Sequence, residues 1–342
     1  MPTIPGPNVP GPAALGPNAP WPVRGRAAVL VTGASSGIGL ELAREAGREG
    51  IPLLLIARDG AALDALAAEL RGAPELMGAT ELMGATELKG ATARAGSIER
   101  AGTIEHAGTI ARAGAGEHPG AVETDGAVKH APPVREAYTL ALDLTAPGAV
   151  AAIGAALTEH GLVCNFLINN AGSGLVGAAA ELAVADQLRI LDLNLRVTVE
   201  LALMALPGML SRGQGGILNV GSVAGFMPGP GMALYYASKA GLRSFSEALW
   251  AETRGRGVAV TLLAPGPVRT PFLERSGAAT TRLFRMPPKA TARHVAKRGW
   301  AGFRRGKRVV FPDALSWLMA HVAPILPRRF LLGQLARLQR RG

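Results

Sequence analysis

The sequence predicts an α/β fold, a doubly wound parallel β-sheet with helices on both faces. Apolar runs of strand length recur from 26–31 to 258–263, segments of helical periodicity separate them, and a glycine-rich turn at 32–39 follows the first run and opens the first helix. Strands that alternate with helices of about ten or more residues favour a parallel sheet covered on both sides. A glycine turn between a strand and a helix is typical of a nucleotide-binding unit.

The periodicity defines the elements in chain order. Short apolar, β-prone runs predict strands, and apolar residues spaced three and four apart predict helices. The predicted strands lie at 26–31, 52–57, 138–142, 163–168, 216–220 and 258–263, and the predicted helices at 40–47, 61–70, 148–157, 186–206 and 236–254. Together they predict a single Rossmann-type domain over 26–286.

Two stretches depart from this pattern. Residues 1–25 are rich in Pro and Gly and are predicted to be a disordered N-terminus. A low-complexity insert at 72–133 interrupts the domain, and nine hexapeptide units with glycine at their fourth position fill 75–128 within it. Such a period could wind a small parallel β-helix. Threonine is frequent at the apolar position and glycine weakens regular elements, so a loop is favoured instead.

The basic charge is concentrated at the C-terminal end. The chain of 342 residues has a net charge of +11, and residues 287–342 contain 13 Lys or Arg against the single acid Asp313. The one cysteine, Cys164, lies in an apolar run and is expected to be a buried small side chain in a reducing compartment. The sequence shows neither a secretory signal pattern nor about 20 uninterrupted apolar residues, so a soluble cytoplasmic protein is expected.

The turn from Thr32 to Gly39, TGASSGIG, has the composition of a phosphate-binding site. Its glycines let the backbone approach a pyrophosphate, whose charge is stabilised by free N–H groups at the helix N-terminus. Its serines add hydroxyl donors. The residues predicted to contact a dinucleotide here are Gly33, Ser35, Ser36, Gly37, Ile38 and Gly39.

The spacing Gly-x-x-x-Gly-x-Gly, with Thr32 ahead of it, resembles the cofactor turn of the short-chain dehydrogenase/reductase family. The resemblance covers about residues 26–275 apart from the insert. Further motifs in the family's order are Asp143 in LDLT, NNAG at 169–172, Asn194, Ser222, the Tyr235 and Lys239 pair, and PGPVRT at 265–270. The resemblance implies hydride transfer between a nicotinamide cofactor and a carbonyl or alcohol.

The end of the second strand selects the cofactor in this family, and Ala57 and Arg58 stand there in this chain. A guanidinium can pair bidentately with a 2′-phosphate, whereas an acid would hydrogen-bond the ribose hydroxyl. Asp59 lies 20 residues after Gly39, so counting alone would nominate it for NAD. We therefore expect NADP(H) as the preferred cofactor, with NAD(H) as the alternative.

The resemblance implies the rest of the cofactor site as well. Contacts are expected beside the adenine, along the cofactor after the fourth strand, and at the nicotinamide, with 271–286 acting as a mobile substrate lid. In that order the implied residues are Asp143 and Leu144, then Asn170, Ala171 and Gly172, then Tyr235, Lys239, Pro265, Gly266, Val268 and Thr270.

Tyr235 and Lys239 form the predicted acid/base pair. A tyrosine with an ordinary pKa of about 10 needs a nearby positive charge to act near neutrality. Lys239 follows four residues later, so both side chains share a helix face, whereas Tyr236 does not fit the family's Tyr-x-x-x-Lys spacing. Ser222 is expected to orient and polarise the substrate carbonyl. By resemblance, Asn194 supports a water-linked proton relay to the lysine.

The predicted function is reduction of a ketone or aldehyde by NADPH, or the reverse oxidation of an alcohol, with 3-oxoacyl thioesters and lipophilic ketones as candidate substrates. The alternative is a non-catalytic NADP-binding sensor or membrane-associated scaffold. A homo-oligomer is expected. No metal site is expected, because His294, His106 and His118 lack partners at ligand spacing.

Residues 287–342 are predicted to be a basic, amphipathic C-terminal extension, similar to the tail of the bacterial branch of the family often labelled DltE-like. The last predicted helix, at 330–341, mixes Leu and Arg. It could lie on an anionic membrane, pack in a dimer, or cap the substrate channel. No base-reading motif accompanies the charge, so no nucleic-acid partner is expected.

Overall fold

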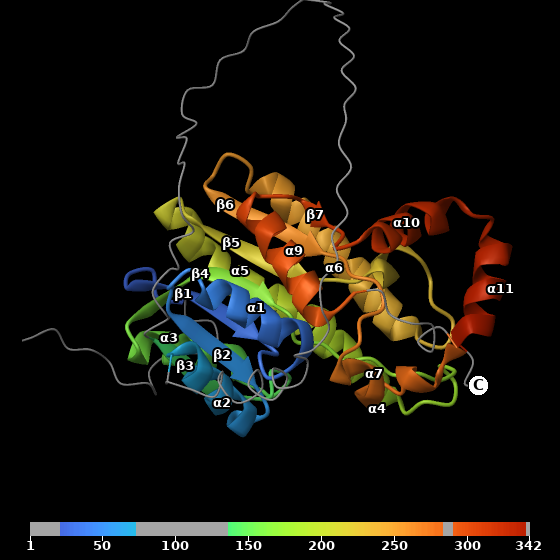
Figure 1. Ribbon diagram of the computed structural model, residues 1–342, viewed down its shortest axis with the longest axis horizontal. Coiled ribbons are helices and arrows are strands. Elements are labelled where there is room, and N and C mark those ends of the chain that lie inside the picture. Colours follow the sequence, from blue (N-terminus) through green and yellow to red (C-terminus); the bar gives the residue numbers. More distant parts are fainter. Residues whose placement is uncertain (1–20, 73–135, 283–289, 340–342) are drawn as a thin grey trace, which may run out of the picture. The chain divides into compact units, whose positions relative to one another are not determined.

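A computed structural model describes residues 21–72, 136–282 and 290–339, and its centre is a seven-stranded sheet (Figure 1). Every strand pair is parallel, and the strand order is β3-β2-β1-β4-β5-β6-β7. The strands are β1 (Arg26–Thr32), β2 (Leu53–Ala57), β3 (Ala137–Ala141), β4 (Leu162–Asn169), β5 (Gly215–Val220), β6 (Val258–Leu263) and β7 (Val309–Val310). The predicted doubly wound fold is confirmed, and its order reverses between β1 and β4, where such sheets bind ligands.

Helices cover both faces of this sheet (Figure 1). α1, α2 and α9 contribute to one apolar core, and α3, α5 and α6 contribute to a second core on the opposite face. The helices are α1 (Gly37–Gly47), α2 (Gly60–Leu70), α3 (Ala149–Glu159), α4 (Val184–Leu191), α5 (Val197–Arg212), α6 (Ala233–Glu252), α7 (Pro271–Arg275), α9 (Ala292–Arg304), α10 (Ala314–Val322) and α11 (Arg328–Gln339).

The central strand β1 shows why the two cores form. Successive side chains of a strand point to opposite faces, so a strand covered on both sides must be apolar at every position. Val29 and Val31 belong to one core, and Ala28 and Leu30 belong to the other. All four are fully buried. The continuous apolar run in the sequence is therefore the direct requirement of a central parallel strand.

One long helical stretch, Val184–Arg212, is long and apolar enough to cross a membrane by length and composition. Its inner face nevertheless packs on the sheet, because Leu201, Ala205 and Met209 join Ile217 in the second core. A π-helical turn, Asp192–Arg196, separates α4 from α5. The predicted helix at 186–206 is thus confirmed as a core helix, with one irregular turn in its middle.

The chain before β1 packs more than predicted. Trp21 is only 5% exposed and joins the second core. A Cβ atom on Gly154 of α3 would lie 2.9 Å from Cδ1 of the indole, so the absence of a side chain at Gly154 makes room for the ring. The prediction of disorder is therefore wrong for residues 21–25. Residues 1–20 lie outside the described residues, as does the insert beyond Gly72, so neither view of the hexapeptides is tested.

The C-terminal boundary at 286 is also wrong, because residues beyond it complete the sheet and cover it. β7 pairs with β6, and α9 buries Trp300 and Phe303 in the first core. The Trp300 indole N–H also donates to the Glu49 carboxylate at 2.8 Å. A strand of two residues carries no detectable periodicity, which is why only six strands were predicted from the sequence.

Candidate active site

A cavity of about 430 Å³ lies at the carboxyl ends of the strands. Its wall includes the turn after β1, the residue after β2, the NNAG segment after β4 and the loop after β6. Most of the residues predicted from the sequence line it, namely Gly33, Ser35, Ser36, Gly37, Ile38, Arg58, Asp143, Leu144, Asn170, Ala171, Gly172, Ser222, Tyr235, Lys239, Pro265, Gly266, Val268 and Thr270. Gly39 and Asn194 are outside the wall. The fold therefore collects motifs spread over more than 230 residues into one site.

The turn after β1 has the geometry of an anion cradle. Gly33 and Gly37 have φ angles of +66° and +60°, a left-handed conformation that side chains disfavour. Ser36 is the N-cap of α1, but its hydroxyl makes no capping bond. The first N–H groups of a helix have no partner within the helix, so they are available to an anion together with the positive end of the helix dipole.

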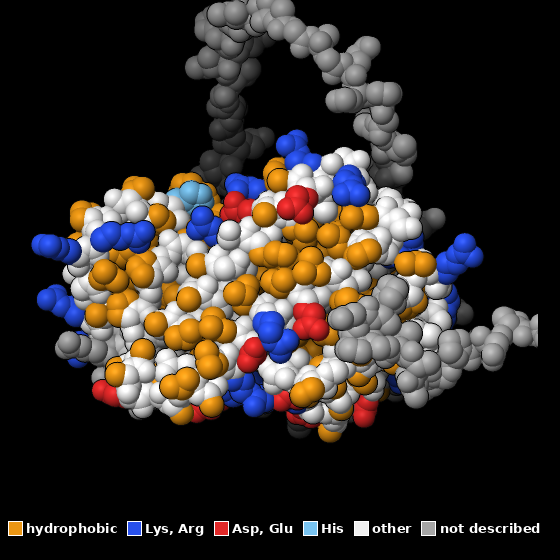
Figure 2. All heavy atoms as spheres, turned by 180° about the vertical axis from the view of Figure 1, so that it is seen from behind, with side chains coloured by type: hydrophobic (Ala, Val, Ile, Leu, Met, Phe, Trp, Pro, Cys, Tyr) orange, Lys and Arg blue, Asp and Glu red, His pale blue; other side chains and the backbone are white. Residues whose placement is uncertain are grey.

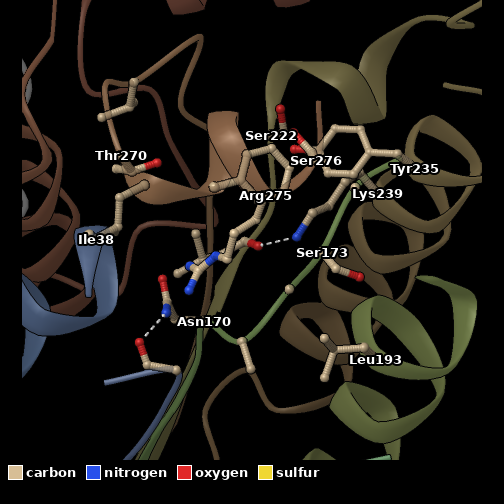
Figure 3. Close-up of a pocket in the computed structure, with 18 of the residues that line it drawn as sticks. Ile38, Asn170, Ser173, Leu193, Ser222, Tyr235, Lys239, Thr270, Arg275 and Ser276 are labelled. Atoms are coloured by element: carbon tan, nitrogen blue, oxygen red, sulfur yellow. Dashed lines mark hydrogen bonds between the residues drawn. The ribbon is translucent and has the colours of Figure 1, made fainter. Parts of the chain in front are cut away.

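Asn170 braces this turn from the neighbouring strand. Its side-chain amide donates to the backbone oxygens of Thr32 and Gly33, both at 3.1 Å, and its backbone N–H donates to the Thr32 hydroxyl at 3.0 Å (Figure 3). A Cβ atom on Gly39 would overlap this amide. Gly39 is thus required for packing, and it does not line the cavity, although the sequence predicted it as a cofactor contact.

The wall near β2 carries a positively charged side chain that forms no ion pair with the described residues. Arg58 makes no ion pair with any described carboxylate, and Asp59 caps α2 by accepting from the Ala62 N–H at 3.0 Å. Asp143 is paired with Arg189. The pKa of the Asp143 carboxyl is lowered mainly by hydrogen bonds from the Thr145 side chain and backbone. The positive charges of Arg189 and Arg58 lower it by a smaller amount.

Helix α6 brings Tyr235 and Lys239 to the same wall as Ser222 (Figure 3). The lysine Nζ lies 6.0 Å from the tyrosine ring centroid and donates to the Val220 carbonyl at 2.8 Å. Burial lowers the pKa of Lys239 to about 8. Burial also raises the pKa of Tyr235, more than a hydrogen bond with Ser222 lowers it. The Lys239 ammonium was expected to lower the pKa of Tyr235, and this lowering is absent in the structure. Tyr235 is therefore a neutral phenol, which is the form that can donate a proton.

Asn194 lies in the π-helical turn and is fully buried. Its amide donates to the Ser173 carbonyl at 2.9 Å and to the Ser238 hydroxyl at 3.1 Å, and its oxygen accepts from the Ser173 N–H at 2.8 Å. A Cβ atom on Gly172 would lie 3.2 Å from the Asn194 oxygen and 3.7 Å from the Lys239 amine. Asn194 therefore stands directly behind the cavity wall, and π-turns of this kind recur at functional sites.

The opposite end of the cavity is apolar and was missed in the sequence. Phe272 lies 5.5 Å from the Tyr235 ring, centroid to centroid. Met319 of α10 and Leu335 of α11 reach the wall, so the C-terminal helices cap the cavity, one of the three roles considered for the tail. The apolar lining also includes Met227, Met232 and Leu273. The mixture of Leu and Arg in the last helix left the membrane, dimer and cap roles open, because the sequence does not reveal what the leucines contact.

Tyr236 is not an alternative acid. Its hydroxyl accepts a hydrogen bond of 2.6 Å from the side-chain amide of Gln339, near the end of α11, and burial raises its pKa strongly. Arg275 of α7, which the sequence did not single out, also lines the cavity. Among the described residues, no group of three or more His, Cys, Asp or Glu could hold a metal ion. His294 instead contacts the Pro312 carbonyl at 3.1 Å.

A doubly wound sheet with a glycine turn and a Ser-Tyr-Lys group on one cavity defines a class of nucleotide-dependent oxidoreductases. A family model described as short chain dehydrogenase matches residues 27–98 and 109–280. The chain therefore belongs to the short-chain dehydrogenase family. The likeness of its tail to the DltE-like branch stays a prediction.

Several relatives have names that describe activities. The sulfoacetaldehyde reductase of Chromohalobacter salexigens is 38% identical over 166 residues, which is 47% of this chain and 66% of that protein. The 3-oxoacyl-acyl-carrier-protein reductase FabG of Vibrio cholerae is 35% identical over 131 residues, 38% of this chain and 54% of that protein. The chain thus spans roughly half to two thirds of the length of these curated relatives.

A solved structure matches over more of the chain. The short-chain dehydrogenase from Sphingobium yanoikuyae, determined in complex with NADPH, has a TM-score of 0.61 and 28% identity. The match covers 84% of this chain and 88% of that one.

Proposed function

We propose that the protein is an NADPH-dependent carbonyl reductase that can also run the reverse oxidation of an alcohol. The single observation that carries the proposal is that Ser222, Tyr235 and Lys239 line the same cavity as the glycine turn. Proton donation and dinucleotide binding are thereby available at one site. The reductases among the relatives and the NADPH complex of the Sphingobium protein support the same class of reaction.

The described residues fit a nicotinamide dinucleotide. Gly33 and Gly37 leave room for the phosphates, and the unpaired guanidinium of Arg58 after β2 favours the 2′-phosphate of NADP(H) over the free ribose of NAD(H). Asp59 is engaged in capping α2, which argues against its use as an NAD-selecting acid. Leu144, Ala171 and the other predicted cofactor contacts apart from Gly39 line the same cavity.

When bound, the cofactor supplies the hydride. The chain's own residues then control the proton. Tyr235 donates its phenolic proton to the developing alkoxide, and Ser222, which lines the same wall of the cavity, orients the carbonyl. Lys239, held by the Val220 carbonyl, places a positive charge beside the resulting tyrosinate. Asn194 positions the segment at Ser173 behind the lysine.

The substrate end favours a lipophilic ketone or an acyl chain. Methionine, leucine and phenylalanine side chains form this end of the wall, and flexible methionines adapt to varied apolar ligands. The wall carries few charged side chains, and the Lys239 Nζ lies 6.0 Å from the Tyr235 ring centroid. The charged residues of the wall are Arg58, Asp59, Asp143, Arg189, Lys239 and Arg275. An uncharged apolar substrate therefore loses the least hydration on binding.

Turnover of NADPH against a panel of ketones, aldehydes and 3-oxoacyl thioesters tests the proposal. Tyr235→Phe is expected to lower the rate by at least a hundredfold while cofactor binding persists. Tyr138→Phe is the matched control, because the Tyr138 hydroxyl bonds to Glu136 away from the cavity, and it should retain turnover. NADPH binding without turnover on any carbonyl, unchanged by Tyr235→Phe, would favour the sensor alternative.

The outer face of the C-terminal cap suggests a partner. Trp317, Ile325 and Phe330 are 52%, 79% and 54% exposed, and the described residues 314–339 contain arginines but no acid. In Figure 2, basic and hydrophobic side chains stand together toward the edge that carries these helices. A second copy of the chain and an anionic membrane surface both fit. Sedimentation of the pure protein with and without anionic vesicles distinguishes the two partners, since a dimer forms without vesicles and membrane binding requires them. A cytoplasmic location is compatible with both partners.

A further inference from the structure

Arg275 is a second open positive charge in the cavity. It is the last residue of α7, and its guanidinium donates to the Ser36 hydroxyl at 3.3 Å. It forms no ion pair with any carboxylate of the described residues. Figure 3 shows the side chain extending into the cavity toward the side where Ile38 and Asn170 lie. A long, flexible cation is thus held over the phosphate turn by a single weak contact.

The segment that carries Arg275 lies against this turn independently of that contact. A Cβ atom on Gly37 would lie 3.1 Å from Cγ2 and 3.2 Å from Cβ of Thr270, the N-cap of α7. Ser36 and Gly37 are the N-cap and first residue of α1. The first turn of α1 and the start of α7 are therefore neighbours, although 239 residues separate Ser36 from Arg275.

The charges on the wall are not balanced. Four cationic and two acidic side chains line the cavity, and Arg189 is already paired with Asp143. Lys239 is held by a backbone carbonyl beside the catalytic tyrosine. Arg58 and Arg275 form no ion pair with a described carboxylate, although Arg58 is close enough to lower the Asp143 pKa slightly. Arg58 lies after β2 and Arg275 lies over the N-terminus of α1. Two open guanidiniums at two different places suit a ligand with two separate anionic groups.

We propose that Arg275 binds the pyrophosphate of the dinucleotide, while Arg58 binds its 2′-phosphate. The proposal rests on the proposed function, since it assigns a residue to the cofactor of that reaction. When the dinucleotide binds, the Arg275 guanidinium exchanges its weak bond to Ser36 for charge-assisted bonds to pyrophosphate oxygens. The Ser36 hydroxyl then becomes free to donate to the pyrophosphate as well. The contact also holds α7, whose Phe272 packs on the Tyr235 ring, against the cofactor.

Direct binding measurements with ligands that differ in their anionic groups test this assignment. Dissociation constants for NADPH and NADH are measured from the fluorescence of the bound dihydronicotinamide, and for adenosine 2′-monophosphate by competition. Arg275→Gln should weaken NADPH and NADH equally, by about tenfold or more, and leave the 2′-monophosphate unchanged. Arg58→Gln should weaken NADPH and the 2′-monophosphate and spare NADH. Arg275→Lys should recover part of the loss, because it keeps the charge without the planar fork.

Arg269→Gln is the matched control, since Arg269 is an exposed arginine in the loop before α7 and is absent from the cavity wall. It should change none of the three constants. Equal loss in Arg269→Gln would show a general field effect and overturn the assignment. Unchanged binding of both dinucleotides by Arg275→Gln, or loss confined to the ligands with a 2′-phosphate, would also overturn it. Wild-type protein that binds neither dinucleotide would overturn this inference together with the proposed function. Wild-type binding without turnover would overturn only the function.

Discussion

Replacing Gly39 with alanine should distort the cofactor turn, because the added methyl group would displace the groups packed against Gly39. A methyl group there would overlap the Gly33 carbonyl oxygen and the Asn170 amide, and its Cβ would lie 2.9 Å from the Asn170 Cγ. The carbonyl belongs to the backbone and cannot move freely. The amide can move only by giving up its bonds to the Thr32 and Gly33 oxygens. The substitution therefore breaks the brace between β1 and β4.

The magnitude follows from these contacts. Two lost hydrogen bonds cost about 1 kcal/mol each, and overpacking costs about 1–3 kcal/mol more. Alanine is more favourable than glycine in a helix by about 1 kcal/mol, which offsets part of this loss. A net loss of about 3 kcal/mol in the free energy of unfolding is expected, together with at least tenfold weaker NADPH binding.

Denaturant unfolding and cofactor titration measure the two effects of Gly39→Ala. Gly333→Ala in α11 is the matched control, because its Cβ would meet no atom within 4 Å. It should be neutral or stabilising by up to about 1 kcal/mol. Wild-type stability and wild-type NADPH affinity in Gly39→Ala would refute the packing argument.

Three further predictions concern the lysine, the N-terminal tryptophan and the insert. Because burial lowers the pKa of Lys239 from 10.5 to about 8, the unfolded state binds more protons between these values. The stability of the wild type relative to Lys239→Met should therefore rise by on the order of 3 kcal/mol from pH 8 to pH 10.5, and parallel pH profiles of the unfolding free energy would contradict this. Trp21→Ala should lower the free energy of unfolding by about 3 kcal/mol, because the ring fills the space beside Gly154. Trp21→Phe should lower it by less. Equal stability of wild type and Trp21→Ala would show that this packing is dispensable. Deleting residues 75–128 should leave unfolding and NADPH affinity nearly unchanged, whereas loss of folded protein would show that the insert is structural.

Several features were predictable because they depend on neighbours in sequence. The apolar run at β1 and the glycines that follow it are local patterns, and so is the four-residue spacing of Tyr235 and Lys239 on α6. Each reflects a steric or periodic constraint within a few residues. The family resemblance extended this local information to Ser222 and Asn194, whose roles no spacing rule would assign.

Other features required the three-dimensional arrangement. Trp21 looked like part of a disordered terminus, and its burial depends on a glycine in α3 more than 130 residues away. Gly39 matched a ligand-binding motif, yet its neighbours make it a packing residue. β7 was too short to detect and is defined only by its pairing with β6.

The sequence by itself determined the sheet class, the glycine turn and the placing of Tyr235 and Lys239 on one helix face, because backbone conformation and helix periodicity are set over a few residues. Only the tertiary structure decided that α10 and α11 close the apolar end of the cavity and that Arg275 stands over Ser36. Both contacts join segments far apart in the chain. Their existence depends on the strand order and on how the helices pack, which no local pattern encodes.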